Sequence, residues 1–291
     1  MEGQLESTLE RGALYVVGTP IGNLGDFSPR AVETLEQADF VAAEDTRVTL
    51  KLLNHFGIKK PLISYFEHNK LEHGPVIVAR LKEGQTCALV SDAGMPAVSD
   101  PGETLVASCA AEGLPVYVVP GPTAAVSALA VSGLPTGRFA FEGFLSVNKR
   151  SRKEHLDAVA AEERTMIFYE APHKLRKTLA EFSKVFGPDR RIALCRELTK
   201  VHEEVWRTTL GEAAAYYRER EPRGEFVLVV AGRQRQEVPE ETHTPEEGAV
   251  RARELVEAGA SPSMAAKQAA QELGLRKGQV YALLVGEDRP D

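Results

Sequence analysis

Three loops rich in glycine and proline carry the residues of this 291-residue chain whose types and spacing suggest chemistry. They are Val17-Gly-Thr-Pro-Ile-Gly-Asn-Leu24, Val90-Ser-Asp-Ala-Gly-Met-Pro-Ala-Val-Ser-Asp-Pro-Gly102 and Val119-Pro-Gly-Pro-Thr-Ala-Ala125. Each follows a short apolar run that is typical of a buried strand. Small residues let a ligand approach the backbone closely, so free amides, the Asp92 carboxylate and the Thr123 hydroxyl would be available to a polar ligand.

The second loop is the most specific of the three, because it repeats Ser-Asp and holds two prolines and two glycines directly after a strand. Few structural turns need that composition. We expect Asp100 to be the N-cap of the following helix, with Pro101 as its first residue. The glycines of the first loop do not match G-x-G-x-x-G, so the sequence disfavours a Rossmann dinucleotide site.

Three charged residues, Glu44, Asp45 and Arg47, follow the apolar run at residues 40–42. They fall at the edge of the crevice that the loops would form. Charges at the end of a buried strand favour a functional role over a purely structural one.

A parallel sheet is needed to position these loops. Apolar runs typical of buried strands lie at residues 13–17, 40–42, 87–90 and 116–119, and helical patterns lie at 28–38 and 100–112. This alternation predicts an α/β domain over residues 13–121. Ligands of such domains bind beyond the carboxyl ends of the strands, so we expect the loops to converge on one crevice.

The remainder of the chain is expected to form further units. A small-residue helix at 123–134 and strand-like runs at 165–169, 191–195, 204–209 and 225–231 predict a second α/β domain over residues 122–233. Residues 234–243 are polar, as in a linker, and residues 244–291 carry the start and stop signals of three short helices. Residues 1–12 are expected to be a flexible N-terminus.

The composition, 43% hydrophobic and 26% charged, is typical of a soluble protein. No apolar run approaches the roughly 20 residues that span a bilayer, so we expect a cytoplasmic protein without membrane contact. The three cysteines, Cys87, Cys109 and Cys195, stand singly and are interpreted as packing residues. No spacing typical of metal ligands is present, so we expect no metal.

The net charge of -7 argues against a nucleic-acid partner, because polyanions are bound through Lys and Arg. The charge is unevenly distributed, however. Residues 145–235 hold 19 Lys and Arg against 14 Asp and Glu, whereas the remaining segments hold 16 against 28. The middle of the chain is therefore the candidate surface for a polyanion, although charge blocks can also merely solvate helices.

The order of the motifs resembles the tetrapyrrole-methylase family, whose fold is a two-domain α/β arrangement. More narrowly, it resembles the branch that methylates the ribose 2′-oxygen of a cytidine in the decoding region of 16S ribosomal RNA. The resemblance covers about residues 12–232. The motifs that carry it are Gly18-Thr-Pro-Ile-Gly-Asn-Leu24, Ala43-Glu-Asp-Thr-Arg47, Ser91-Asp-Ala-Gly-Met-Pro96, Ser99-Asp-Pro-Gly102, Pro120-Gly-Pro-Thr-Ala124, Phe141-Glu-Gly-Phe-Leu145, Phe168-Tyr-Glu-Ala-Pro-His-Lys-Leu175 and Arg196-Glu-Leu-Thr-Lys200.

The porphyrinoid branch of that family typically has Gly-x-Gly-Pro-Gly in the first loop and Gly-Asp-Pro in the second. This chain departs from both patterns, which favours the RNA branch. Two alternatives stay open: a porphyrinoid C-methyltransferase, and a non-catalytic RNA-binding factor of ribosome assembly that kept the crevice.

The resemblance implies S-adenosyl-L-methionine as cofactor, 16S ribosomal RNA or the small ribosomal subunit as partner, and a homodimer. It implies that both domains contribute cofactor contacts, with Glu170 and Thr199 closing the site from the second domain. With Asp92 added from its place in the second loop, the expected cofactor residues are Pro20, Ile21, Asp92, Ala93, Gly94, Met95, Val98, Thr123, Ala124 and Thr199.

Methyl transfer to a ribose oxygen is an in-line displacement in which positioning can supply most of the catalysis. A general base is optional, and the candidates are Glu170, His173, Glu44 and Asp45. His173 begins a helix at a strand end, where capping is as good an explanation as catalysis.

RNA would need cations near the crevice. The candidates are Arg47, Lys149, Arg150, Arg152, Lys153, Lys174, Arg196 and Lys200. The last three helices have the lengths of a helix-turn-helix, but the first is acidic and the later ones carry only Lys267, Arg276 and Lys277 as basic residues, so we expect no DNA binding. The predicted fold is therefore a two-domain α/β tetrapyrrole-methylase-like fold with a small C-terminal three-helix appendage.

Overall fold

The computed structural model describes residues 8–234 and 243–286. Its internal contacts divide the chain into one unit that ends at Arg233 and a second that begins at Gln234. Most of the predicted linker, and the first seven residues of the predicted flexible N-terminus, lie outside the described residues.

The N-terminal part of the first unit is a five-stranded parallel sheet. Its strands are β1 (Leu14–Val17), β2 (Phe40–Ala43), β3 (Leu62–Ser64), β4 (Cys87–Val90) and β5 (Val116–Val119), in the order β3-β2-β4-β1-β5. Every residue of β2 and β4 is buried, as in a parallel strand covered on both faces. The strand runs in the sequence predict four of these strands; β3 is not among them.

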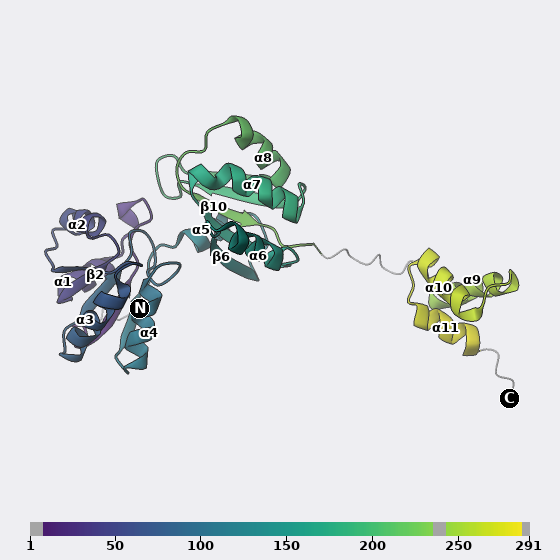
Figure 1. Ribbon diagram of the computed structural model, residues 1–291, viewed down its shortest axis with the longest axis horizontal. Helices are drawn as coiled ribbons and strands as arrows, with labels where there is room; N and C mark the ends of the chain where they lie inside the picture. Colours follow the sequence, from purple (N-terminus) through teal and green to yellow (C-terminus); the bar gives the residue numbers. More distant parts are fainter. Residues whose placement is uncertain (1–7, 235–242, 287–291) are drawn as a thin grey trace, which may run out of the picture. The chain divides into compact units, whose positions relative to one another are not determined.

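Helices cover both faces of this sheet (Figure 1). The helices α1 (Pro29–Gln37) and α2 (Thr46–His55) pack on one face, and α3 (Lys70–Lys82) and α4 (Gly102–Ala111) pack on the other. Alternate strand residues point to opposite faces, so Val41 packs with the first pair of helices and Phe40 with the second.

The start of α4 differs from the expectation. The helix begins at Gly102, with Pro101 as its N-cap residue. The Asp100 carboxylate lies one residue earlier and still caps the turn, because its Oδ1 accepts hydrogen bonds from the amides of Gly102 at 2.7 Å and Ala97 at 2.8 Å. Ser28 caps α1 as expected, with its side chain accepting from the Ala31 amide.

The second half of the first unit is a mixed five-stranded sheet. Its strands are β6 (Phe139–Phe144), β7 (Thr165–Glu170), β8 (Arg191–Arg196), β9 (Glu204–Thr209) and β10 (Phe226–Val230), in the order β6-β7-β10-β8-β9. One face is covered by α6 (Lys149–Val159), α7 (Pro172–Phe186) and α8 (Leu210–Glu219), and the other carries α5 (Ala124–Val131). The β6 strand, absent from the predicted runs, is interrupted by a register shift between Phe141 and Gly143.

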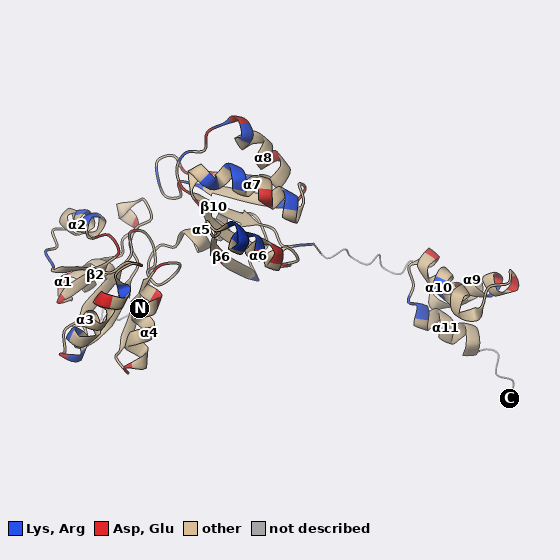
Figure 2. Cartoon of the chain, in the orientation of Figure 1, with Lys and Arg blue, Asp and Glu red and all other residues tan. Residues whose placement is uncertain are grey.

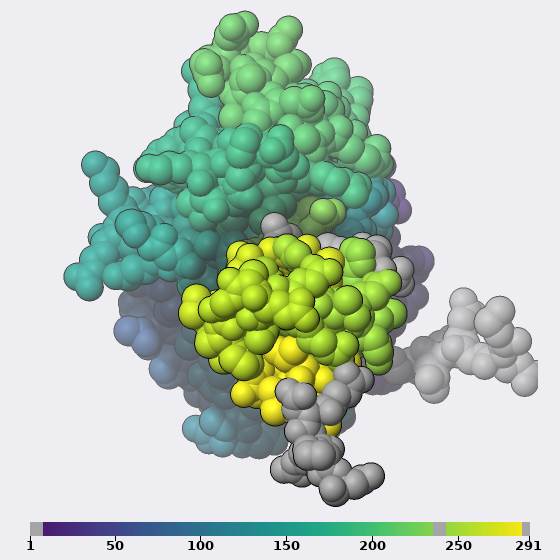
Figure 3. Space-filling model, turned by 90° about the vertical axis from the view of Figure 1, so that its right-hand side faces the viewer, coloured from purple at the N-terminus to yellow at the C-terminus, as the bar shows by residue number. Residues whose placement is uncertain are grey.

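The second unit consists of three short helices, α9 (Pro245–Glu257), α10 (Pro262–Leu273) and α11 (Lys277–Gly286). Thr244 and Glu247 form the predicted capping box, and Gly274 ends α10 in the left-handed conformation. Small side chains fill its core, which lets the helices close into a compact body (Figure 3, yellow). The fold is thus the predicted α/β class with a C-terminal helical appendage.

Within residues 8–234 and 243–286, no helix combines the length and the apolar character that a membrane span requires.

Candidate active site

The first two loops are cross-linked at the carboxyl ends of β1 and β4. The Thr19 amide donates to the Gly94 carbonyl at 2.9 Å, and the Gly94 amide donates to the Thr19 carbonyl at 3.2 Å. The buried Thr19 hydroxyl also donates to the Ser91 carbonyl at 3.2 Å. These bonds fix the loops against each other, as their common position at the sheet edge predicts.

The third loop joins the other two through glycine. A Cβ atom on Gly121 would lie 2.8 Å from the Gly18 carbonyl oxygen and 2.9 Å from the Gly18 Cα, so neither position has room for a side chain. The Gly121 amide points at the Met95 sulfur, 3.3 Å away. All three loops therefore meet in one place.

The second loop holds a strained backbone. Besides Gly94, the non-glycine residues Ala97 and Ser99 have φ angles of 65° and 63°. Such conformations cost on the order of 1 kcal/mol or more each and persist where the surroundings enforce them. Here the Asp100 carboxylate holds the turn through two backbone amides. The loop is therefore preorganised, and it keeps the side chain of Val98 exposed.

The second half of the first unit, predicted as a second domain over residues 122–233, packs against the same loops. Ile21 is buried in a cluster with Ala125, Leu129 and Leu198. The Tyr169 hydroxyl accepts a hydrogen bond from the Ala125 amide at 3.2 Å, just inside the start of α5. The two halves of the first unit therefore pack together at the loop region.

Two adjoining cavities run along the first loop. One, of about 460 Å³, is lined by residues 19–22 and Leu24, by residues 91–93, by five residues of α2, and by Lys200 and Glu225. The other, of about 620 Å³, lies between residues 22–24 and residues 197 and 199–202. The cavities share Gly22, Leu24 and Lys200.

The structure distributes the expected cofactor residues over this region. Pro20, Ile21, Asp92 and Ala93 line the smaller cavity, and Thr199 lines the larger one. Gly94 and Met95 instead tie the loops together, through the contacts described above.

Two other expected cofactor residues begin α5. Thr123 is its N-cap, with the side chain accepting from the Val126 amide, and Ala124 is its first residue.

Acidic side chains gather where β2 and β4 end. Asp45 caps α2 and pairs with Arg47 at 2.6 Å, and hydrogen bonding to Arg47 lowers the pKa of Asp45 to about 2. The Asp92 carboxylate accepts a hydrogen bond from the Asp45 amide at 3.0 Å. Burial, reinforced by the Asp92 charge, raises the pKa of Glu44. Burial also raises the pKa of Asp92.

Glu170 lies inside the second domain. It is 5% exposed, and its carboxylate accepts hydrogen bonds from the Ala171 amide and the Thr178 hydroxyl. Arg152, equally buried, donates to Thr178 at 2.6 Å and pairs with Glu181 at 2.6 Å. These contacts assign Glu170 and Arg152 to a structural network between α6 and α7. We therefore assign neither side chain a role in catalysis or in RNA binding.

The other predicted cations differ in their partners. Lys149 is exposed, Lys174 is half-buried, and Arg150 and Lys153 pair with acids one helical turn away. The predicted base His173 is exposed near the start of α7. Basic residues mark α2, α6 and α7 (Figure 2).

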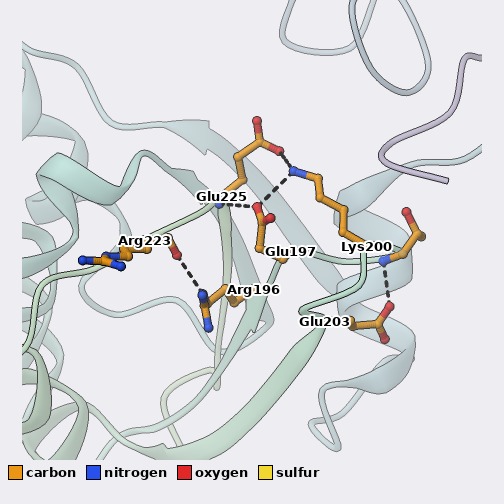
Figure 4. Close-up of polar contacts among 7 residues, drawn as sticks. Arg196, Glu197, Lys200, Glu203, Arg223 and Glu225 are labelled. Carbon is orange, nitrogen blue, oxygen red and sulfur yellow. Dashed lines mark hydrogen bonds and ion pairs between the residues drawn. The ribbon is translucent and has the colours of Figure 1, made fainter.

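Two more of the cations lie near β10. Arg196 donates to the Arg223 carbonyl at 2.7 Å, and Lys200 lies between Glu197 and Glu225, 2.9 Å from each (Figure 4).

One face of α2 belongs to the site although the sequence patterns did not single it out. Val48, Thr49, Lys51, Leu52 and His55 line the smaller cavity. These residues recur at intervals of three and four, directly after the charged residues that follow β2. This helical spacing is the sequence signal that could have identified the face. No group of three or more potential metal ligands gathers anywhere in the described residues.

Comparison with known proteins identifies the family of the chain. The family described as Tetrapyrrole (Corrin/Porphyrin) Methylases matches residues 13–214. The chain belongs to this family. Its methyl donor is S-adenosyl-L-methionine, so the chain is an S-adenosylmethionine-dependent methyltransferase.

Two relatives are called ribosomal RNA small subunit methyltransferase I. The protein of Synechocystis sp. is 50% identical over 274 residues, which cover 94% of this chain and 97% of that protein. The protein of Thermotoga maritima is 46% identical over 223 residues, which cover 77% of this chain and all of that protein, so part of this chain has no counterpart there.

A solved structure shares the fold. A cobalt precorrin-4 methyltransferase superposes with a TM-score of 0.57 at 19% identity, over 77% of this chain and 98% of that one.

Proposed function

We propose that this chain transfers the methyl group of S-adenosyl-L-methionine to the 2′-oxygen of a cytidine ribose in 16S ribosomal RNA, near the decoding region. The observation that carries the proposal is the likeness, over 94% of the chain, to a ribosomal RNA small subunit methyltransferase. The departures of the first two loops from the porphyrinoid patterns support the same reading.

The residues of the three loops fit the cofactor. Gly18 and Gly121 place no side chain between the first and third loops, and the turn at Ala97 and Ser99 fixes the backbone of the second loop. Pro20, Ala93, Gly94, Met95, Val98 and Ala124 would hold its apolar parts, and Asp92 and Thr123 its polar groups. When bound, the cofactor supplies a methyl group that is already activated on a sulfonium.

The protein's contribution is then mainly to orient the ribose hydroxyl and exclude water. As the oxygen–carbon bond forms and the sulfur–carbon bond breaks, the hydroxyl proton must leave. Among the predicted bases, Asp45 is held as an anion by Arg47, and Glu170 is already bonded within its own domain. Glu44, half-buried at the end of β2 with a pKa that burial and Asp92 raise, is the side chain we assign to receive the proton, and the exposed His173 is the alternative.

RNA would reach the site across the cations that remain at the surface. Arg47 is largely exposed beside the acidic cluster, and Lys149, Arg150 and Lys153 occupy the exposed side of α6. Lys174 and Arg196 belong to the same proposal. Because such contacts neutralise phosphates, affinity for RNA should fall as salt rises.

The test is transfer of labelled methyl from the cofactor to two acceptors: small ribosomal subunits that lack the modification, and a uroporphyrinogen. We expect label on the subunits and none on the porphyrinogen. Label on the porphyrinogen alone would assign the chain to the porphyrinoid branch. Label on neither, with cofactor still bound, would leave the non-catalytic RNA-binding reading.

Two further properties belong to this proposal. The chain would act as a homodimer, which sedimentation of the purified protein tests. It would act in the cytoplasm, where small subunits are assembled, and fractionation of cells followed by immunoblotting tests that location.

A further inference from the structure

One buried hydroxyl near the first loop has no explanation in the fold. Thr49, in the middle of α2, is 2% exposed, and its Oγ1 has no hydrogen-bond partner within the described residues. Thr34 of α1 is equally buried, and its Oγ1 donates to the Arg30 carbonyl at 2.7 Å. Native proteins rarely bury a polar group unpaired, because it loses its bonds to water without replacement. A bound ligand could therefore supply the hydrogen-bond partner that the Thr49 hydroxyl lacks.

Thr49 lines the smaller cavity, whose walls suit a flat, partly apolar group. Ile21 and Leu52 form an apolar part of the wall of this cavity. Leu24 and Val48 leave about two-fifths of their surface, 42% and 39%, exposed at this cavity. Pockets of this kind, mostly apolar with a few placed polar groups, are typical of small-molecule and nucleoside sites.

The same cavity also carries charged side chains of both signs, namely Lys51 and Lys200 and the carboxylates of Asp92 and Glu225. Lys51 and His55 line it from α2 and are both exposed, and no carboxylate lies within ion-pair distance of either in the part of the chain that the structure describes. Lys200 enters from the second domain, held between Glu197 and Glu225 (Figure 4). Of the four charged side chains, Lys51 is the one that makes no hydrogen bond or ion pair within the described residues, and an unpaired ammonium favours a phosphate-bearing ligand.

The adjoining cavity repeats the pattern. Thr199 Oγ1 is also buried without a partner in the described part of the chain, and Thr199 lines the larger cavity. The two cavities share Gly22, Leu24 and Lys200. Two unpaired hydroxyls in connected cavities point to an extended ligand with repeated polar groups, as a polynucleotide strand has, rather than to a single compact molecule.

We propose that the cavity at Thr49 receives the nucleoside of the RNA strand whose ribose is methylated, and that the cavity at Thr199 receives its neighbour. This inference rests on the proposed function. The base lies against the apolar wall, the Thr49 hydroxyl bonds to a polar atom of the nucleoside, and Lys51 and Lys200 face the phosphates. Residues 91–93, shared with the second loop, place this nucleoside next to the cofactor loops.

The first test replaces Thr49 with valine, which has the same shape without the hydroxyl. Three quantities are measured: the KM and kcat for methyl transfer to undermethylated small subunits, cofactor affinity by calorimetry, and the unfolding temperature. T49V should lower kcat/KM for the subunits by between about twofold and tenfold, as expected for the removal of one hydrogen bond. It should leave cofactor affinity unchanged and should not lower the unfolding temperature, because every bond within the protein is kept.

The matched control is T34V, which removes a hydroxyl that does have a partner within its own helix. It should lower the unfolding temperature and leave the kinetics toward the subunits unchanged. A second pair tests the charge: K51E should weaken binding of the subunits, whereas K59E, at an exposed lysine just before β3 and so at the opposite edge of the parallel sheet, should not.

Three results would overturn the inference. If T49V weakens cofactor binding, the cavity belongs to the cofactor. If neither T49V nor K51E changes the kinetics toward the subunits, no nucleoside enters there, although the proposed function stands. If the unaltered protein transfers methyl to the porphyrinogen and not to the subunits, the proposed function itself fails and the nucleoside assignment fails with it.

Discussion

Thr19 and Gly94 exchange two backbone hydrogen bonds, at 2.9 and 3.2 Å, and so join the loops that follow β1 and β4. One side of this junction faces the third loop through Gly18 and Gly121, and the other side borders the cavity at Thr49. A change in the backbone here would therefore disturb the cofactor loops and the proposed nucleoside site together.

Adding a methyl group at Gly121 tests how tightly the loops are packed. In G121A the new Cβ would lie 2.8 Å from the Gly18 carbonyl oxygen, so one backbone must move. Overpacking of this kind costs about 1–3 kcal/mol, and we expect a lower unfolding temperature together with cofactor affinity reduced at least about tenfold. The control is G137A, whose Cβ would meet no atom within 4 Å. Equal cofactor affinity for both variants in calorimetry would contradict the contact.

The buried arginine of α6 should matter for stability rather than for RNA. R152M would remove one of the two hydrogen bonds of Thr178 and the nearer partner of Glu181, which is partly exposed and keeps Lys177 at 3.7 Å, so we expect a loss of about 1–3 kcal/mol. The matched control is R150M, whose exposed pair with Glu154 is worth less than about 1 kcal/mol. Urea unfolding measures both, and equal midpoints would show that the network contributes nothing.

The exposed cations of α6 should matter for RNA rather than for stability. Reversing Lys149 and Lys153 to Glu removes charges that would neutralise phosphates, so RNA affinity should fall. The slope of log affinity against log salt should flatten by about 1 for each phosphate that is no longer neutralised. Filter binding over a salt series measures the slope, and calorimetry should find cofactor affinity unchanged. An unchanged slope would remove this helix from the interface.

The pH dependence should report on Glu44. Burial and the Asp92 charge raise its pKa above the usual 4.5, so the folded chain keeps this proton at a pH where the unfolded chain has released it. The stability from Glu44 is therefore present below pH 4.5 and is lost as pH rises through the raised pKa. Methyl transfer needs the carboxylate and should rise over the same interval.

The variant that tests this assignment is E44Q, which should be slower by about 100-fold at neutral pH and should lack this limb of the rate profile. The control is E33Q, an exposed position of α1. If E44Q keeps the rate and the profile of the unaltered protein, Glu44 does not receive the proton.

Much of the architecture follows from local signals. The runs ending at Val17, Val90 and Val119 are all apolar, and the first and the last also contain β-branched residues next to glycine or proline, which is typical of buried strands. β3 has only three residues, and β6 holds Glu142 and Gly143 with a register shift, so neither shows a regular pattern. Hydrogen bonding to β2 and to β7 makes β3 and β6 strands, although their own sequences do not predict it.

The site was predictable in its backbone and less so in its side chains. Loop composition pointed to the region where the three loops meet, because close backbone contact requires glycine at Gly18 and Gly121. Burial of individual side chains depends on partners distant in the sequence. Arg152 belongs to a run of charges that is typical of an exposed helix face, and only the packing of α6 on α7 places it beside Thr178. The same holds for Thr49.

The most direct test is to locate the methyl group. Small subunits lacking the modification are incubated with the protein and the cofactor, and their 16S RNA is digested with alkali and mapped by mass spectrometry. A methyl group on a ribose 2′-oxygen blocks alkaline cleavage, so we predict one alkali-resistant dinucleotide that begins with a methylated cytidine from the decoding region. A methyl group on a base, or no methylated RNA while a porphyrinogen accepts the label, would contradict the account.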